Sequence, residues 1–193
     1  MKYRLVAAPE PEPVYLAQLK AHLGVTLDID DALLARKIAA ARDYVERFIG
    51  RPILAATFEG FLPRFPPREI RLPVGPLRGV EAIFYRDAQG IERTLDAEAY
   101  LVDDVSDPGQ VLPAAGRSWP ATAPVPNAVR VRFVAGLQGA EAGGVPEGLQ
   151  EAILQLAAWW FEQREAAIVD GSAREIPFGV AELLREYRDW SFG

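Results

Sequence analysis

The most regular apolar pattern in the chain lies between Pro146 and Ala166. Leu149, Ile153, Leu156 and Trp160 recur at helical spacing, which places them on one stripe of an α-helix. Other apolar residues widen this surface beyond one stripe: Ala152, Ala157, Ala158, Trp159 and Phe161. A helix with so wide an apolar surface is normally covered on more than one side. We therefore expect either that the domain buries it completely or that a second subunit covers the remainder.

Three further helices are predicted on either side of the chain's middle. The first spans Val14 to Leu23, and the last runs from about Pro177 to Trp190. The longest begins at Asp30 or Asp31, where a carboxylate can accept hydrogen bonds from first-turn N–H groups, and it ends at Gly50. The apolar residues of this longest helix recur at steps of three and four: Leu34, Ile38, Ala41, Val45 and Phe48.

Between Ile53 and Gly136 the apolar period changes towards two, and proline and glycine recur at short intervals. This pattern predicts a small antiparallel sheet or sandwich of short strands, with a hairpin turn at Asp87–Gly90. The predicted strands are 55–62, 69–73, 80–87, 91–95, 100–103, 110–112 and 128–135. In the last of them Arg130 and Arg132 alternate with apolar residues, so one face of that strand is charged.

These elements predict an α+β fold, namely an antiparallel bundle of about four helices with a small inserted antiparallel β-domain. Residues 14–52 and 146–193 would supply two helix pairs that form one helical domain. Residues 53–136 would form the inserted β-region, followed by a linker at 137–145. Residues 1–13, in which prolines alternate with alanine and glutamate, are expected to form an extended arm.

The charge and composition of the 193 residues narrow the classes of function. The formal net charge is −6, which argues against tight binding of nucleic acid, although DNA could pass close by. Cysteine is absent, so disulfides and thiolate chemistry are excluded. No stretch approaches the roughly 20 apolar residues that span a bilayer, and no membrane association is expected. No motif for a cofactor or a metal is present, so neither is predicted.

Acidic residues and one histidine are the candidates for catalysis. His22 is interpreted as a helix residue outside any site, because no nucleophile motif accompanies it. Asp28, Asp30 and Asp31 are interpreted as helix-capping residues. The second acidic group, Asp103, Asp104 and Asp107, is interpreted as part of a solvated turn. Carboxylates that are distant in the sequence can still come together in the fold, so a small hydrolase is kept as an alternative hypothesis. A protein-interaction module of non-viral origin is another.

The order of segments along residues 14–190 resembles the head–tail connector, or adaptor, proteins of long-tailed phages and of gene transfer agents. The resemblance is carried by AHLGV, by DIDDALLARKIAAARDYVERFIGRPIL, by the central REIRLPVGPL and SWP, by PNAVRVRFVAG, by VPEGLQEAILQLAAWWFEQREA and by EIPFGVAELLREYR. The central β-region is an addition that shorter relatives lack, and the ending Trp190-Ser191-Phe192 matches no family pattern.

This resemblance implies a structural protein without catalytic activity. Its copies would form a ring, commonly twelve-fold, that docks beneath the portal in the particle neck after assembly in the bacterial cytoplasm. The ring would extend the channel for double-stranded DNA and present a surface to a stopper or tail-completion protein, while an isolated subunit could be a monomer. The C-terminal segment would engage the portal through Phe178, Tyr187, Arg188, Trp190 and Phe192. The expected contacts between subunits are Leu149, Ile153, Trp159, Trp160, Arg130 and Arg132.

Overall fold

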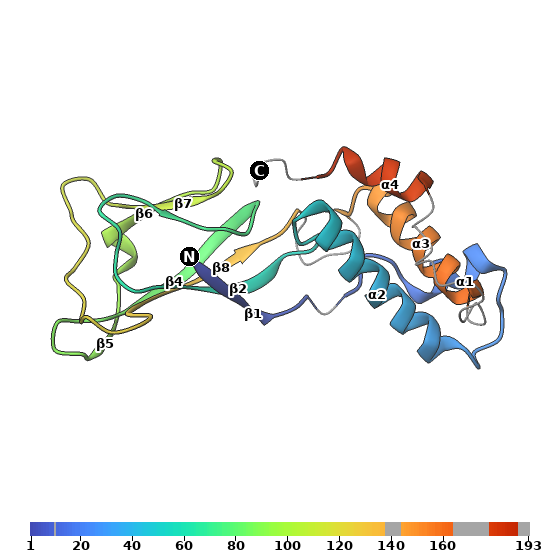
Figure 1. The fold of residues 1–193 in the computed structure, drawn as a ribbon, viewed down its shortest axis with the longest axis horizontal. Helices are drawn as coiled ribbons and strands as arrows, with labels where there is room; N and C mark the ends of the chain where they lie inside the picture. The colour runs from blue at the N-terminus through green and yellow to red at the C-terminus, as the bar shows by residue number, and fades with distance from the viewer. Residues whose placement is uncertain (10, 138–143, 164–177, 189–193) are drawn as a thin grey trace, which may run out of the picture. The chain divides into compact units, whose positions relative to one another are not determined.

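The chain divides into two compact units, a β unit and a helical unit, in a computed structural model that describes residues 1–9, 11–137, 144–163 and 178–188 (Figure 1). The β unit comprises Met1–Pro9 and Leu54–Ala140, and the helical unit comprises Glu10–Ile53 and Glu141–Gly193. Each unit is therefore assembled from two separate segments of the chain.

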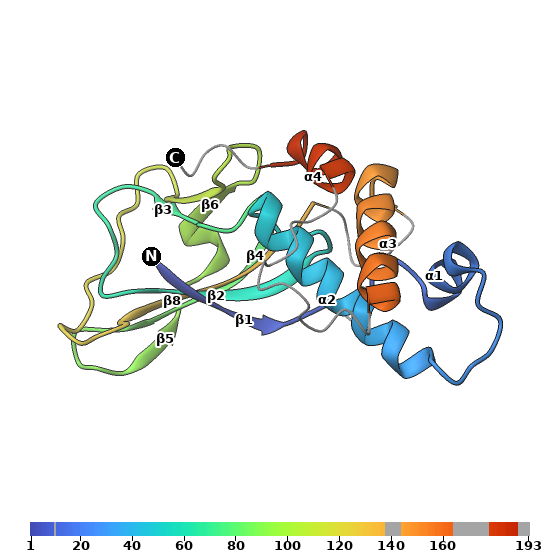
Figure 2. The same cartoon turned by 45° about the vertical axis from the view of Figure 1, so that its right-hand side comes forward.

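The larger sheet of the β unit has five antiparallel strands in the order β1-β2-β8-β4-β5 (Figures 1 and 2). The central strands β2 (Ala56–Leu62) and β8 (Val129–Ala135) pair along their whole lengths, from Ala56 opposite Ala135 to Leu62 opposite Val129. The other three strands are β1 (Lys2–Ala7), β4 (Leu77–Arg86) and β5 (Glu92–Thr94). Strands β4 and β5 are joined by the predicted turn, in which Gly90 adopts a φ of 81°.

A second sheet of three antiparallel strands has the order β3-β7-β6. Its strands are β3 (Ile70–Arg71), β7 (Gln110–Pro113) and β6 (Tyr100–Asp103), and a short 3₁₀ helix, η1 (Ala97–Ala99), precedes β6. Ile70 and Val102 both lie opposite Val111, so these side chains point to the same side of the sheet.

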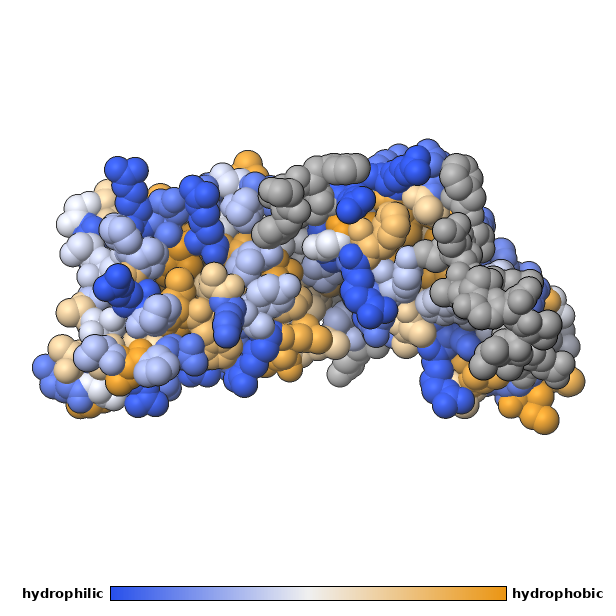
Figure 3. Space-filling view, viewed as in Figure 1, coloured by the Kyte–Doolittle hydropathy of each residue, from blue (hydrophilic) through white to orange (hydrophobic). Residues whose placement is uncertain are grey.

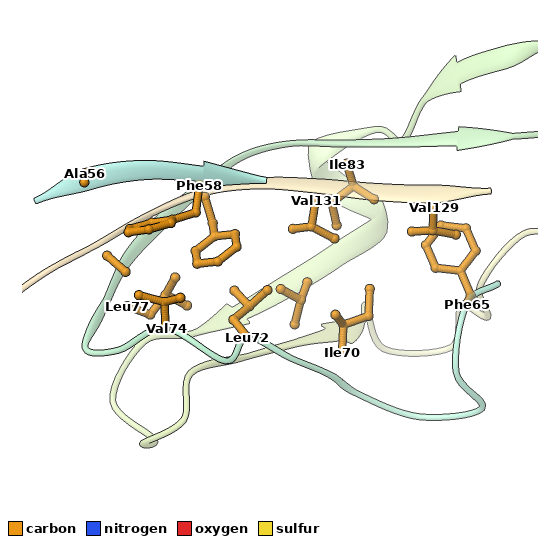
Figure 4. Packing of buried hydrophobic residues seen from close by; sticks show 13 residues of the cluster. Ala56, Phe58, Phe65, Ile70, Leu72, Val74, Leu77, Ile83, Val129 and Val131 are labelled. Carbon is orange, nitrogen blue, oxygen red and sulfur yellow. The ribbon is translucent and has the colours of Figure 1, made fainter. Parts of the chain in front are cut away.

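The two sheets share one apolar core, to which both contribute alternate residues of their strands (Figure 4). Phe58 stacks on Phe133 with 5.8 Å between the ring centroids, and Phe133 is fully buried. Around them lie the other members of the cluster, which are Ala56, Phe65, Ile70, Leu72, Val74, Leu77, Ile83, Val111, Val129, Val131 and Ala135. The β unit is thus a sandwich, and the residues that alternate with this core point away from it.

The helical unit is built around α3 (Glu147–Glu162), which packs against each of the other three described helices. These are α1 (Leu16–Leu23), α2 (Asp31–Ile49) and α4 (Phe178–Arg185). Gly24 and Gly50 follow α1 and α2 at φ values of 68° and 75°, a left-handed conformation that favours glycine. The core contains most of the predicted stripe residues of α2 and α3, namely Leu34, Ile38, Ala41, Val45, Leu149, Ile153 and Leu156. The other two, Phe48 and Trp160, are half-buried.

The predicted assembly of these elements, a four-helix antiparallel bundle with a small inserted β-domain, is wrong. The described residues form eight strands in two sheets beside four helices, and two of those helices, α1 and α4, have only eight residues each. Moreover, β1 comes from the start of the chain and pairs with β2, so the β unit is not a single insertion. The prolines at positions 9, 11 and 13 predicted an extended arm for this segment, although the alternation in Lys2-Tyr3-Arg4-Leu5 is a strand pattern.

No helix in the described part of the chain is both long enough and apolar enough to cross a membrane.

Candidate functional site

The predicted contact residues on α3 fall into a buried pair and a half-exposed pair. Leu149 and Ile153 are fully buried inside the helical unit, so their side chains offer no surface to a neighbouring molecule. Trp159 and Trp160 are half-exposed. The apolar surface of α3 is therefore covered mostly by the chain's own helices, and the apolar residues that stay partly open are Leu154, Trp159 and Trp160.

Trp160 belongs to an aromatic row that continues along α2. Its ring meets Tyr44 edge-to-face, with centroids 6.1 Å apart, and Tyr44 stacks on Phe48 at 6.4 Å. The guanidinium carbon of Arg188 lies 5.9 Å from the centroid of the Phe48 ring, a cation–π distance. We call Trp160, Tyr44, Phe48 and Arg188 the aromatic row. Such half-buried aromatic side chains are typical anchors of protein interfaces.

The predicted portal-docking residues are only partly covered by the structure. Phe178 is the first residue of α4, whereas Trp190 and Phe192 lie outside the described residues. Tyr187 is half-buried against α3, where a Cβ placed on Gly148 would lie 2.9 Å from the tyrosine hydroxyl oxygen. Burial raises the pKa of Tyr187, and a hydrogen bond with Glu186 acts in the same direction. Tyr187 therefore takes part in the packing of the helical unit itself.

The two predicted arginines of β8 converge on a buried carboxylate. Glu59 of β2 is 1% exposed and accepts hydrogen bonds from Arg130 at 3.0 Å and from Arg132 at 2.8 Å. A third guanidinium, that of Arg4 on β1, donates to the other carboxylate oxygen at 2.7 Å. Since Glu59, Arg130 and Arg132 alternate with core residues, this arginine cluster lies on the face of the large sheet that points away from the core.

Electrostatics in the arginine cluster favour the ionised form of Glu59. Burial alone would raise the pKa of this carboxyl, but hydrogen bonds from Arg4 and Arg132 and the charge of Arg130 lower it overall. Aromatic rings support the guanidinium groups, because Arg130 lies 4.3 Å from the centroid of Phe84 and Arg4 lies 5.3 Å from that of Phe61. Three cations around one carboxylate leave this cluster with an excess of positive charge.

Arg4 and Glu59 were not predicted from the sequence as members of this cluster. One signal was available, because Glu59 is the one charged residue of the strand Ala56–Leu62. A shallow pocket of about 170 Å³ adjoins the cluster, and Phe61, Phe84, Arg86, Glu92, Asn127 and Arg130 are among its lining residues. In Figure 3, hydrophilic and hydrophobic residues are interspersed on the visible face of the β unit.

The acidic candidates for catalysis serve local structure. Asp28 forms an ion pair with Lys20 at 2.6 Å, and this hydrogen bond lowers its pKa. Asp103 accepts a hydrogen bond from the Ser106 hydroxyl at 2.6 Å, which lowers the pKa of Asp103 and closes the turn after β6. His22 is exposed on α1. Within the described ranges, no three histidine, aspartate or glutamate side chains gather as they would around a metal ion.

Comparison with known proteins gives a consistent match over most of the chain. The family model of the phage gp6-like head–tail connector protein matches residues 13–110 and 120–188. No curated protein matches the chain.

Three solved structures are similar over nearly the full length of the chain. A chain from the neck of an empty gene transfer agent particle, computed with C6 symmetry, has a TM-score of 0.76. One from the virion of a native gene transfer agent particle has 0.74, and one from a native neck computed with C12 symmetry has 0.72. Each is 26% identical, and each comparison covers 97% of this chain and 95% of the other.

Proposed function

Since the chain belongs to the phage gp6-like head–tail connector family, we propose that twelve copies form a ring that joins the portal to a stopper or tail-completion protein. The chain is a structural connector subunit of the neck of a phage or gene transfer agent particle, where it forms a ring. The observation that carries this conclusion is the family match together with the 26% identity to neck proteins over 97% of the chain.

The half-exposed aromatic residues are the proposed contact surface of the helical unit. Trp159 and Trp160 lie on α3 with their rings partly open to solvent, and Tyr44 and Phe48 extend the apolar surface along α2. Leu149 and Ile153 support this surface from inside, because they fix α3 in the core. On the β unit, Arg130 and Arg132 are the proposed contacts, held in place by Glu59.

The portal is the proposed partner of the C-terminal end of the chain. Arg188 sits at the end of the aromatic row, and the tail that contains Trp190 and Phe192 follows it directly. Two large aromatic side chains among four residues would gain about 2–3 kcal/mol each if a partner's groove buried them. Tyr187 would hold the start of this tail against α3.

DNA is proposed as the content of the ring's channel and not as a bound ligand. The net charge of −6 supports this interpretation, because each phosphate that a protein neutralises adds salt-sensitive affinity that would slow passage. No catalytic role is proposed either, since the family and the neck relatives are structural proteins. The carboxylates that a hydrolase would need are used instead for an ion pair by Asp28 and for a turn by Asp103.

Removal of residues 189–193 tests the docking role of the tail. The shortened chain keeps Tyr187 against α3, so its free energy of unfolding should stay within about 0.5 kcal/mol of the full chain. It should nevertheless no longer bind portal-containing particles in a sedimentation assay. A matched control is Lys37→Glu, a charge change on α2, which should bind normally. Unchanged binding by the shortened chain would refute the docking role.

A further inference from the structure

Among the described residues, four strands of the β unit lie at sheet edges: β1 and β5 in the five-stranded sheet, and β3 and β6 in the three-stranded sheet. The backbone N–H and C=O groups along such an edge can pair with another chain, and proteins normally cover or charge the edge to prevent it. Here the edges at β1 and β6 carry opposite charges, and both expose apolar side chains.

The β1 edge is basic. All six residues of β1 are exposed, and the exposed fractions of Tyr3, Leu5 and Val6 are 52%, 53% and 44%. Lys2 and Arg4 alternate with Tyr3 and Leu5, so they point to the same face of the sheet as the arginine cluster. Lys2, Arg4, Arg86, Arg130 and Arg132 lie on that face, with Glu59 and Glu92 between them.

The β6 edge is acidic. Residues 95–116, which include η1, β6 and the turn after β6, contain five acidic residues and no basic one. Apolar side chains are exposed beside these charges, since Leu101 is 58% exposed and Val105, in the turn after β6, is 92% exposed. The turn that presents Val105 and Asp104 is fixed by Asp103, which accepts hydrogen bonds from the backbone N–H groups of Val105 and Ser106.

We propose that the acidic β6 edge of one copy, with the turn that follows it, docks against the basic β1 edge of the next copy. A ring needs such a heterologous contact, in which two different patches of each copy are complementary. The two edges belong to the two opposed sheets of one sandwich, so one contact leaves the other edge available for a third copy. The inference rests on the proposed function, because it specifies which surfaces join the copies of the ring.

Charge and apolarity favour a second copy over DNA as the occupant of the basic face. Glu59 and Glu92 lie among the arginines and would repel phosphates, and Tyr3, Leu5 and Val6 gain nothing from a phosphate backbone. An acidic edge with exposed Leu101 and Val105 matches both properties. Two β1 edges would repel each other, as would two β6 edges, so the charges also favour the head-to-tail pairing that a ring requires.

Crosslinking between copies tests this contact directly, because the chain has no cysteine of its own. Full-length Val6→Cys and Val105→Cys chains, one with a size tag, are mixed with the portal protein of their particle and treated with a short bismaleimide. The matched control replaces the Val105→Cys chain by Ile29→Cys, since Ile29 is 88% exposed and Val105 is 92% exposed. The tagged–untagged product should form several times faster with Cys at position 105 than at position 29.

Charge reversal gives a second, independent measurement. Lys2→Glu should lower the yield of mixed product about fivefold at low salt, and Asp104→Lys in the partner chain should restore it. The inference is overturned if microscopy shows rings on the portal while the pair at positions 6 and 105 reacts no faster than the control pair at positions 6 and 29. That outcome would leave the proposed ring intact. It is also overturned if Lys2→Glu leaves crosslinking unchanged and instead abolishes binding of a fluorescent DNA duplex. Absence of any ring on the portal would refute the proposed function itself.

Discussion

The β unit buries Glu59 completely and the helical unit half-buries Glu46, and the electrostatic results are opposite. Glu59 of the β unit is surrounded by three guanidinium groups, which lower its pKa although burial acts against them. Burial is the largest influence on Glu46 of the helical unit, and it raises the pKa although Arg42 and the N–H of Ile53 act in the opposite direction. Three guanidinium groups outweigh burial at Glu59, whereas one guanidinium and one backbone N–H do not outweigh it at Glu46.

The two units also differ in what their surfaces expose. The helical unit buries most of the apolar surface of α3 among its own helices and exposes an aromatic row. The β unit buries its apolar residues between two sheets and exposes charged edges, one basic and one acidic. Aromatic contacts supply interface energy, whereas complementary charges favour one partner and one orientation. We infer that the helical unit contributes more to affinity and the β unit more to the register of the ring.

The largest expected effect is in the β core. Phe133→Ala removes a fully buried ring that stacks on Phe58, and it should lower the free energy of unfolding by about 3–5 kcal/mol. Denaturant unfolding measures the loss, and amide exchange should accelerate first in β2 and β8. A loss below about 1 kcal/mol would contradict the central place of Phe133 in the sandwich.

An intermediate effect is expected on the helical surface. Trp160→Ala removes a half-exposed ring and one edge-to-face contact with Tyr44, so the isolated chain should lose only about 1–2 kcal/mol. Phe161→Ala on the same helix is the matched control, and it should cost about 3–5 kcal/mol because Phe161 is 8% exposed. Equal losses in the isolated chain would mean that Trp160 is a core residue and would remove the case for an aromatic contact surface.

The next effect depends on pH. Glu59→Gln weakens three charge-assisted hydrogen bonds and should cost about 1–3 kcal/mol at pH 7. Because the pKa of Glu59 is lowered in the folded state, its contribution is complete above the unfolded-state pKa and is lost as pH falls through the folded-state pKa. Urea unfolding between pH 7 and pH 3 should therefore show the wild type and Glu59→Gln converging below about pH 4. A difference independent of pH would contradict the role of the charge.

The smallest effect should have the opposite sign. The folded-state pKa of Glu46 is raised, so the ionised carboxylate costs stability at neutral pH and protonation recovers it as pH falls. The free energy of unfolding of Glu46→Gln, relative to that of the wild type, should accordingly be highest at pH 7 and should fall as the pH is lowered. The same urea series measures this trend. A parallel trend for Glu46→Gln and Glu59→Gln would remove the contrast between the two units.

Local pattern was sufficient to predict most of the elements but not their assembly. Helix α2 was predicted well because its stripe is regular and Gly50 marks its end, and β6 was predicted at its observed bounds. Strand β1 was not predicted, because the prolines at positions 9, 11 and 13 favoured an extended arm over the short alternation in Lys2-Tyr3-Arg4-Leu5. The sheet order, and with it the sandwich, depends on pairing of distant segments, and no local pattern encodes that pairing.

The residues of the candidate site were predictable only in part, because they too come from distant segments of the chain. Arg130 and Arg132 were identified from their alternation in one strand. Their partners Glu59 and Arg4 lie on other strands, and Glu59 is 71 residues from Arg130 and 55 from Arg4. Half-exposure of Trp159 and Trp160 also depends on where α2 and α4 lie against α3, which the apolar pattern of α3 alone does not reveal.

Electron microscopy of the full-length chain mixed with the portal protein of its particle tests the central claim most directly. The account predicts a closed ring with rotational symmetry on the portal, formed by this chain and absent when the chain is omitted. Bare portals in the presence of an excess of folded chain would contradict the account.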